Sequence, residues 1–164
     1  MKTAVEPATQ EDVYRVALAM RERDFAEMSA VARVDVRKHL ATQLSARYGN
    51  RPDILCGKVD GEPVCIGGTI EAWPNVMSLL FFATDDFPKI GLTITRFIKK
   101  ELFPRYFEAG VHRIQAISLD GYVEVHDWLR SLGLEEEAVF PAYGKGGETF
   151  LQFAAVRDVR PSGA

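Results

Sequence analysis

The three histidines are the first residues to consider for chemistry, because histidine titrates near neutral pH and binds metals. His39, His112 and His126 fall in three different expected elements, and none has a Cys, Asp or Glu at a recognised ligand spacing. No metal site is therefore expected. His126 and Asp127 could act as a base and its orienting partner, but neighbours on a helix point about 100° apart and do not face each other.

The two cysteines, Cys56 and Cys65, flank the dipeptide Asp60-Gly61, which favours a two-residue hairpin turn. In such a hairpin, residues whose numbers add up to 121 face each other, so the two thiols would be direct neighbours with Cα atoms ~4.5 Å apart. That spacing is at the short edge of the disulfide range. We nevertheless expect free thiols in a reducing compartment.

Four exposed-looking side chains are candidates for protein contacts. Arg21 and Arg23 belong to the mixed-charge stretch Met20–Asp24, which suits either a solvated helix end or a partner's surface. Trp73 precedes a proline in an expected loop. Lys145 lies in Gly144–Gly147, which lacks the Lys-Ser/Thr that follows a phosphate loop and which we interpret as a hairpin loop able to grip a neighbouring subunit.

Composition limits the possible functions. The chain has 164 residues, 20 basic and 23 acidic, for a net charge of −3, and 47% of its residues are hydrophobic. These values indicate one soluble domain, which we assign to residues 1–158 with a tail at 159–164, and no overall positive field for nucleic acid. No apolar run approaches the ~20 residues needed to cross a bilayer, and no signal peptide is evident, so the cytoplasm is the expected location.

Hydrophobic periodicity predicts an α/β (α+β) domain with a mixed, mostly antiparallel sheet of about seven strands and about four helices. Thr9 is the expected N-cap of the first helix, and Pro88 opens a long amphipathic helix that ends near Phe103-Pro104. The expected order is strand, two helices, three strands, helix, strand, helix and two strands. The strands are expected at 3–6, 54–59, 63–72, 76–83, 111–119, 134–141 and 148–156, and the second helix at about 35–48.

This order, with the Val59–Val64 hairpin and the Trp128–Leu134 helix end, resembles the GNAT superfamily of N-acetyltransferase-like proteins over nearly the whole chain. The resemblance implies an acyl-CoA pyrophosphate held by backbone N–H groups at the start of the third helix, in an Arg/Gln-x-x-Gly-x-Gly/Ala loop. The corresponding stretch is Asp85–Leu92. If acetyl-CoA binds, the resemblance places it on Lys89, Ile90, Gly91 and Leu92 and on backbone donors of the preceding strand.

The loop departs from that family pattern. Pro88 removes a donor, Phe87 and Ile90 add bulk, and Asp85 and Asp86 add carboxylates beside a polyanion. Leu129 stands where family enzymes often carry a tyrosine that protonates the leaving thiolate, although Tyr122 or Tyr143 could approach by another route. These departures predict an obstructed cofactor seat, and no catalytic residue is assigned.

A closer likeness is to the GNAT-like family typified by the internal virion protein A of short-tailed phages. It is carried by Met20–Asp24, Thr84–Pro88 and His126–Leu129. It implies a non-catalytic protein of virion assembly or of the particle, without a cofactor, located in the virion or the host cytoplasm, whose partners are other particle proteins or copies of itself. The alternatives are an acyl-CoA-dependent N-acetyltransferase with a modified loop and a small regulatory or toxin-related domain that binds another ligand.

Overall fold

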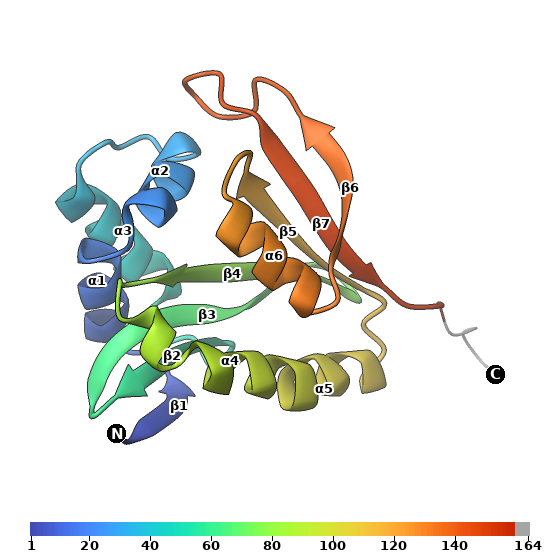
Figure 1. The fold of residues 1–164 in the computed structure, drawn as a ribbon, viewed down its shortest axis with the longest axis horizontal. Helices are drawn as coiled ribbons and strands as arrows, with labels where there is room; N and C mark the ends of the chain where they lie inside the picture. Colours follow the sequence, from blue (N-terminus) through green and yellow to red (C-terminus); the bar gives the residue numbers. More distant parts are fainter. Residues whose placement is uncertain (160–164) are drawn as a thin grey trace.

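One seven-stranded sheet forms the centre of the protein, as seen in a computed structural model that describes residues 1–159 (Figure 1). The last five residues of the expected tail lie outside the described residues. The strand order is β1-β2-β3-β4-β5-β7-β6, and every neighbouring pair is antiparallel except β4 and β5. The expected α/β class and mostly antiparallel sheet are therefore confirmed. The strands are β1 (Thr3–Pro7), β2 (Ile54–Val59), β3 (Glu62–Trp73), β4 (Val76–Ala83), β5 (Arg113–Leu119), β6 (Glu135–Phe140) and β7 (Phe150–Val156).

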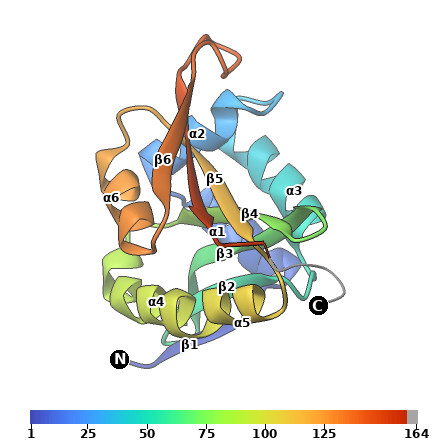
Figure 2. The same ribbon diagram turned by 90° about the vertical axis from the view of Figure 1, so that its right-hand side faces the viewer.

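Helices cover both faces of the sheet, and each face has its own apolar core (Figures 1 and 2). On one face, α1 (Gln10–Leu18) and α3 (Arg37–Tyr48) pack on the first half of the sheet. On the other face lie α6 (Val123–Ser131) and a continuous helical segment made of α4 (Gly91–Phe97), a π-helical turn (Ile98–Leu102) and α5 (Phe103–Glu108). Within residues 1–159, no helix has the length and apolarity that a membrane span requires.

Two expected helix boundaries can be checked directly. Thr9 caps α1 through a reciprocal capping box with Asp12, as predicted. The expected stop at Phe103-Pro104 is wrong, because the helix runs on to Glu108. The π-helical turn explains why: the Phe103 N–H donates to the carbonyl of Ile98, five residues back, so the helix passes the proline with a local change of pitch.

The segment Glu22–Ala30 forms an additional helix, α2, which the sequence pattern did not predict. It lies at the end of the sheet where β4 and β5 diverge (Figure 1). Its N-terminus is attached to the end of β4, because the Arg21 N–H donates to the Ala83 carbonyl at 2.8 Å and Met20 forms a bridge with Thr84.

The predicted register of the β2–β3 hairpin is wrong beyond its first two pairs. Val59 faces Glu62 and Lys58 faces Pro63, but the next pair is Gly57 with Cys65, so β3 carries one extra residue, Val64. A bulge suits this position because proline cannot donate to the ladder. The shift leaves Cys56 opposite Ile66, so the two thiols lie on opposite faces of the sheet, in different cores.

Candidate functional site

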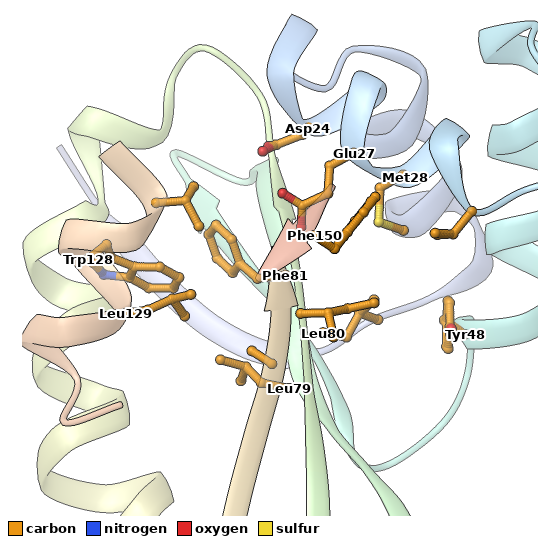
Figure 3. A pocket seen from close by; sticks show the side chains of 14 residues that line it. Asp24, Glu27, Met28, Tyr48, Leu79, Leu80, Phe81, Trp128, Leu129 and Phe150 are labelled. Carbon is orange, nitrogen blue, oxygen red and sulfur yellow. The ribbon is translucent and has the colours of Figure 1, made fainter. Parts of the chain in front are cut away.

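A pocket of about 220 Å³ lies where β4 and β5 separate (Figure 3). The two strands pair only over Val76–Ser78 and Arg113–Gln115, and beyond these residues they diverge. The pocket lies between α2 and α6 and takes its lining from both, from the two strands, and from α3 and β7. It is lined by Asp24, Glu27, Met28, Val31, Tyr48, Leu79, Leu80, Phe81, Ala116, Ile117, Val125, Trp128, Leu129 and Phe150.

Backbone groups at the end of β4 point toward α2 and this pocket. The Ala83 N–H donates to Asp24, and the Ala83 carbonyl accepts from Arg21. Because every second residue of a strand presents its N–H and C=O to the same edge, Phe81 presents its groups to the same side as Ala83, beyond the last β4–β5 pair, Ser78 with Gln115. The backbone of Phe81 could therefore bond to a ligand in the pocket.

Asp24 links α2 to the end of β4 and to Tyr122, which follows β5. Its carboxylate is buried and accepts from the Ala83 N–H at 2.9 Å, from the Tyr122 hydroxyl at 2.7 Å and from Arg21 Nε at 2.9 Å. Burial, together with the adjacent Asp24 charge, raises the pKa of Tyr122. The hydroxyl of Tyr122 is thus committed to Asp24 and is a poor proton donor at neutral pH.

Glu27 is the chemically most distinctive residue of the pocket. Its side chain extends from α2 into the pocket (Figure 3), where Oε2 accepts from Ser118 Oγ and from the Leu119 N–H, each at 3.2 Å. Burial raises the pKa of Glu27 to about 7, and the two hydrogen bonds oppose that rise. A carboxyl with this pKa exchanges protons readily at neutral pH, which is the property of a general base.

His126 lies behind Glu27 in a hydrogen-bonded chain. Its Nε2 is 3.1 Å from both Ser118 Oγ and the Leu119 carbonyl oxygen. Because a carbonyl only accepts, Nε2 carries the proton. The Ser118 hydroxyl, which donates to Glu27, connects His126 to Glu27. Burial lowers the pKa of His126. Asp127 does not contact His126, as expected for neighbours on a helix, and instead contacts Arg130 at the surface.

The loop that the resemblance assigns to pyrophosphate binding uses most of its donors internally. The N–H groups of Phe87, Lys89 and Ile90 donate to Thr84, Asp86 and Phe87, in that order. The Lys89 ammonium pairs with Asp86 at 3.2 Å, and the Ile90 side chain is buried in the core.

α4 begins at Gly91, and its regular intrahelical bonds begin with the Ile94 N–H, which donates to the Ile90 carbonyl. Of the four residues predicted to bind a cofactor, Gly91 and Leu92 therefore lie in the first turn of this helix. Helix N-termini attract phosphates because they carry N–H donors and partial positive charge.

Aromatic side chains fill the space between α4 and α6. Phe81 and Phe87 lie with their ring centroids 4.5 and 5.9 Å from that of Trp128, and Arg21 stacks over Phe87 at 5.3 Å. The indole N–H of Trp128 donates to Thr95 Oγ1 at 2.9 Å, which ties α6 to α4. We call these four side chains, Arg21, Phe81, Phe87 and Trp128, the aromatic cluster.

The residues predicted to contact partner proteins have different surroundings. Arg21 belongs to the aromatic cluster and pairs with Asp24, and Arg23 contacts Glu124 at 3.4 Å. Lys145 reaches the loop after α2, where Nζ donates to the Ala32 carbonyl at 2.7 Å. Trp73 ends β3 with 59% of its surface exposed. Tyr143, named above as a possible acid, stacks on Phe140 and does not line the pocket.

Sequence reasoning missed Asp24 as an anchor and Glu27 altogether. The signal was present in their spacing, because Asp24, Glu27, Met28 and Val31 recur at i, i+3, i+4 and i+7, and all four line the pocket. The helical periodicity was hard to see because two of the four positions carry carboxylates and only two are apolar.

Solved structures share this fold at low sequence identity. The ribosomal-protein-S18-alanine N-acetyltransferase from Escherichia coli superposes with a TM-score of 0.68 at 15% identity, covering 99% of each chain. A ribosomal-protein-alanine N-acetyltransferase from Brucella melitensis gives 0.67 at 21% identity, covering 94% of this chain and 99% of the other. Ard1 from Thermoplasma volcanium gives 0.67 at 13% identity, covering 95% and 98%.

No protein-family model matches the chain, and no curated protein matches it. None of the comparisons supports the expected phage virion family, nor the expectation that the protein lacks catalysis. The structural similarity extends over nearly the whole chain, so this protein has the fold of the GNAT N-acetyltransferases.

Proposed function

We propose that the protein is an acyl-CoA-dependent N-acyltransferase in which Glu27 is the general base. The observation that carries the proposal is the position of Glu27, a carboxyl with a pKa of about 7 that projects into the pocket between β4 and β5. The fold, shared with proteins whose names specify N-acetyltransfer, supports the same activity. This proposal replaces the expectation of a non-catalytic virion protein.

The chemistry of amine acylation explains why such a carboxyl is useful. A free primary amine has a pKa of about 10 and is mostly protonated at neutral pH, so it is not nucleophilic until it loses a proton. Glu27 can take that proton inside the pocket, where its two hydrogen bonds hold the carboxylate in place. Bound acyl-CoA supplies the thioester carbonyl that the amine attacks.

Groups that could hold the acyl-CoA lie on both sides of the pocket. The first-turn amides of α4 could bind its phosphates, and the backbone groups of Phe81, which point to the diverging side of β4, could bind its arm. The aromatic cluster must move apart to admit that arm. Neither Leu129 nor Tyr122 can readily protonate the leaving thiolate, but a thiol pKa of about 8.5 lets it leave without a protein acid.

The test is thiol release from acetyl-CoA with a panel of primary amines, by wild type and by Glu27→Gln. We expect the variant to lose about 100-fold in kcat/KM while calorimetry shows unchanged acetyl-CoA binding. Glu22→Gln is the matched control, since Glu22 lies on the same helix and is exposed. It should remain active.

The pH profile separates a base from a merely structural carboxyl. Wild-type kcat/KM should rise with pH, reach half of its plateau near pH 7, the pKa of Glu27, and level off above it, and the Gln variant should lack this limb. A wild-type protein that neither binds acetyl-CoA nor releases thiol with any amine would refute the proposed function.

A further inference from the structure

A second hollow adjoins the pocket on the side of α2 and α3. Its volume is about 270 Å³, and it shares Met28, Val31 and Tyr48 with the pocket, so the two spaces adjoin at these side chains. Met28 and Tyr48 lie on the side of the pocket away from Trp128 (Figure 3). The hollow therefore continues the pocket away from the aromatic cluster. It is lined by Met28, Val31, Ala32, Arg33, Leu40, Gln43, Leu44, Arg47 and Tyr48.

The charges of the two spaces have opposite signs. The pocket contains the carboxyls of Asp24 and Glu27, and Asp24 is already paired with Arg21. The hollow is lined by two arginines, Arg33 and Arg47, and by no acidic residue. Both arginines are exposed, and among residues 1–159 neither forms an ion pair or a hydrogen bond through its side chain. One carboxyl is thus available at the inner end and two cations at the outer end.

The wall between these charges is apolar and adjustable. Met28 is unbranched and flexible, so its side chain can move to join the two spaces. Arg47 lies over the ring of Tyr48, 5.3 Å from its centroid, and this contact holds its charge at the edge of the hollow. A ligand that spans both spaces would contact an acid, then aliphatic and aromatic side chains, then two arginines.

We infer that the acyl acceptor is an apolar primary amine that carries an anionic group, such as a carboxylate, at its far end. This inference rests on the proposed function and adds the acceptor's chemical class to it. The amino group meets Glu27, the apolar body passes Met28, and the anion meets Arg33 and Arg47. Polyamines and basic peptides are disfavoured because their second positive charge would face the arginines.

Two sources could supply this chemistry, a free ω-amino carboxylic acid or the N-terminus of a peptide with an apolar first residue and an acidic residue after it. Calorimetric binding without acetyl-CoA tests both. The probes are a chain-length series of ω-amino carboxylic acids, a set of Leu-initiated short peptides with Glu at successive positions, and for each the neutral amide counterpart. The set that binds with this preference identifies the source.

We expect one set to bind at least tenfold more tightly than its amides, with an optimum in length. The double variant Arg33→Gln, Arg47→Gln should abolish that tenfold preference while leaving the affinity for the amides unchanged. Arg105→Gln is the control, because Arg105 is exposed on α5, on the other face of the sheet, and should have no effect.

Failure of this inference differs from failure of the proposed function. Equal affinity for acids and amides, or a preference that survives in the double variant, overturns the inference even if the protein acetylates amines. Arginine-dependent binding of the acids supports the inferred ligand class even if acetyl-CoA turnover is absent, and in that case only the role of this ligand as an acyl acceptor, and with it the acyltransferase proposal, falls.

Discussion

Opposing effects set the pKa of Glu27, and burial, which raises it, is the largest of them. Removal from water favours the neutral acid, and the nearby charge of Asp24 adds to this. The Leu119 N–H, the Ser118 hydroxyl and the Arg21 charge favour the carboxylate. The pKa of about 7 is the balance of these effects, so removing any one of these partners should shift the pH profile of the reaction.

This pKa makes the stability of the protein depend on pH in a predictable direction. The Glu27 pKa is 4.5 in the unfolded chain and about 7 in the folded one, so between these values the folded state binds more protons. Stability must therefore fall as pH rises from 4.5 to 7, by about 2 kcal/mol after allowing for partial exposure of the side chain. Urea unfolding of Glu27→Gln across this range should lack that decline, whereas Glu22→Gln should retain it. An identical decline in both variants would contradict the prediction.

Asp24 should contribute more to folding than any exposed carboxylate. Asp24→Asn leaves the buried Arg21 contact without its counter-charge and weakens the bonds to Ala83 and Tyr122, so we expect a loss of about 3 kcal/mol in the free energy of unfolding. Asp127→Asn, which disrupts an exposed pair with Arg130, should cost under about 0.5 kcal/mol. Chemical denaturation at pH 7 measures both. Equal losses would show that Asp24 is not an anchor.

At the scale of elements, the sequence pattern predicts a helix well where the buried face is purely apolar. Val13, Val16 and Ala17 are buried on α1 as expected, and Met20 is buried too, although it lies beyond the helix in the bridge to Thr84. On α2, two carboxylates occupy positions that an amphipathic helix normally gives to apolar residues, so the periodicity fails there. Asp24 and Glu27, which interrupt the apolar pattern, are also residues that line the pocket.

The hairpin between β2 and β3 shows a second limit. The turn residues Asp60 and Gly61 fix the first pairs, both with positive φ (49° and 82°), as a two-residue turn requires. The extra residue, Val64, is inserted where the Thr84 N–H donates to the Val64 carbonyl, a contact from a distant part of the chain. No local rule could have placed that contact, so the predicted register was wrong for the cysteines.

The aromatic cluster should respond to the cofactor. If acyl-CoA enters between α4 and α6, Phe87 must move away from Trp128 and the indole bond to Thr95 must loosen. With Trp73→Phe, Trp128 is the only tryptophan, and acetyl-CoA should shift its emission to longer wavelength as the ring becomes more exposed. Phe87→Ala in that background should show part of the shift without ligand. Tight binding with unchanged emission would mean that the cofactor enters elsewhere.

At the scale of the whole molecule, two parts of the sheet share only a short parallel pairing. Strands β1–β4 and strands β5, β7 and β6 meet over Val76–Ser78 and Arg113–Gln115 (Figures 1 and 2). Side chains hold the diverging ends at a fixed distance: Asp24 contacts Tyr122, Glu27 contacts Leu119, and Trp128 contacts Thr95. The pocket therefore depends on α2, the helix that its own functional residues made hard to predict.

Lys145 adds the outermost of these connections. Its backbone N–H donates to Ala30 at 2.8 Å, and its ammonium donates to Ala32 and Val34 and pairs with Asp35 at 2.7 Å. The β6–β7 loop is thereby fastened to the segment that follows α2. Because Arg33 lies between the two carbonyls that the ammonium binds, this contact also restricts the position of Arg33.

Lys145→Met should release that segment while leaving the rest of the fold intact. Only partly exposed charged contacts are lost, so we expect about 1 kcal/mol of destabilisation. Amide hydrogen exchange should accelerate at 31–36 and at 142–148, yet remain unchanged in the β2–β3–β4 core. Affinity for anionic amines should weaken as well, since Arg33 would no longer be restrained. Lys89→Met, which removes an ammonium from an exposed pair with Asp86, is the control and should leave both regions protected. Unchanged exchange at 31–36 in Lys145→Met would show that the two parts of the sheet are held together without this residue.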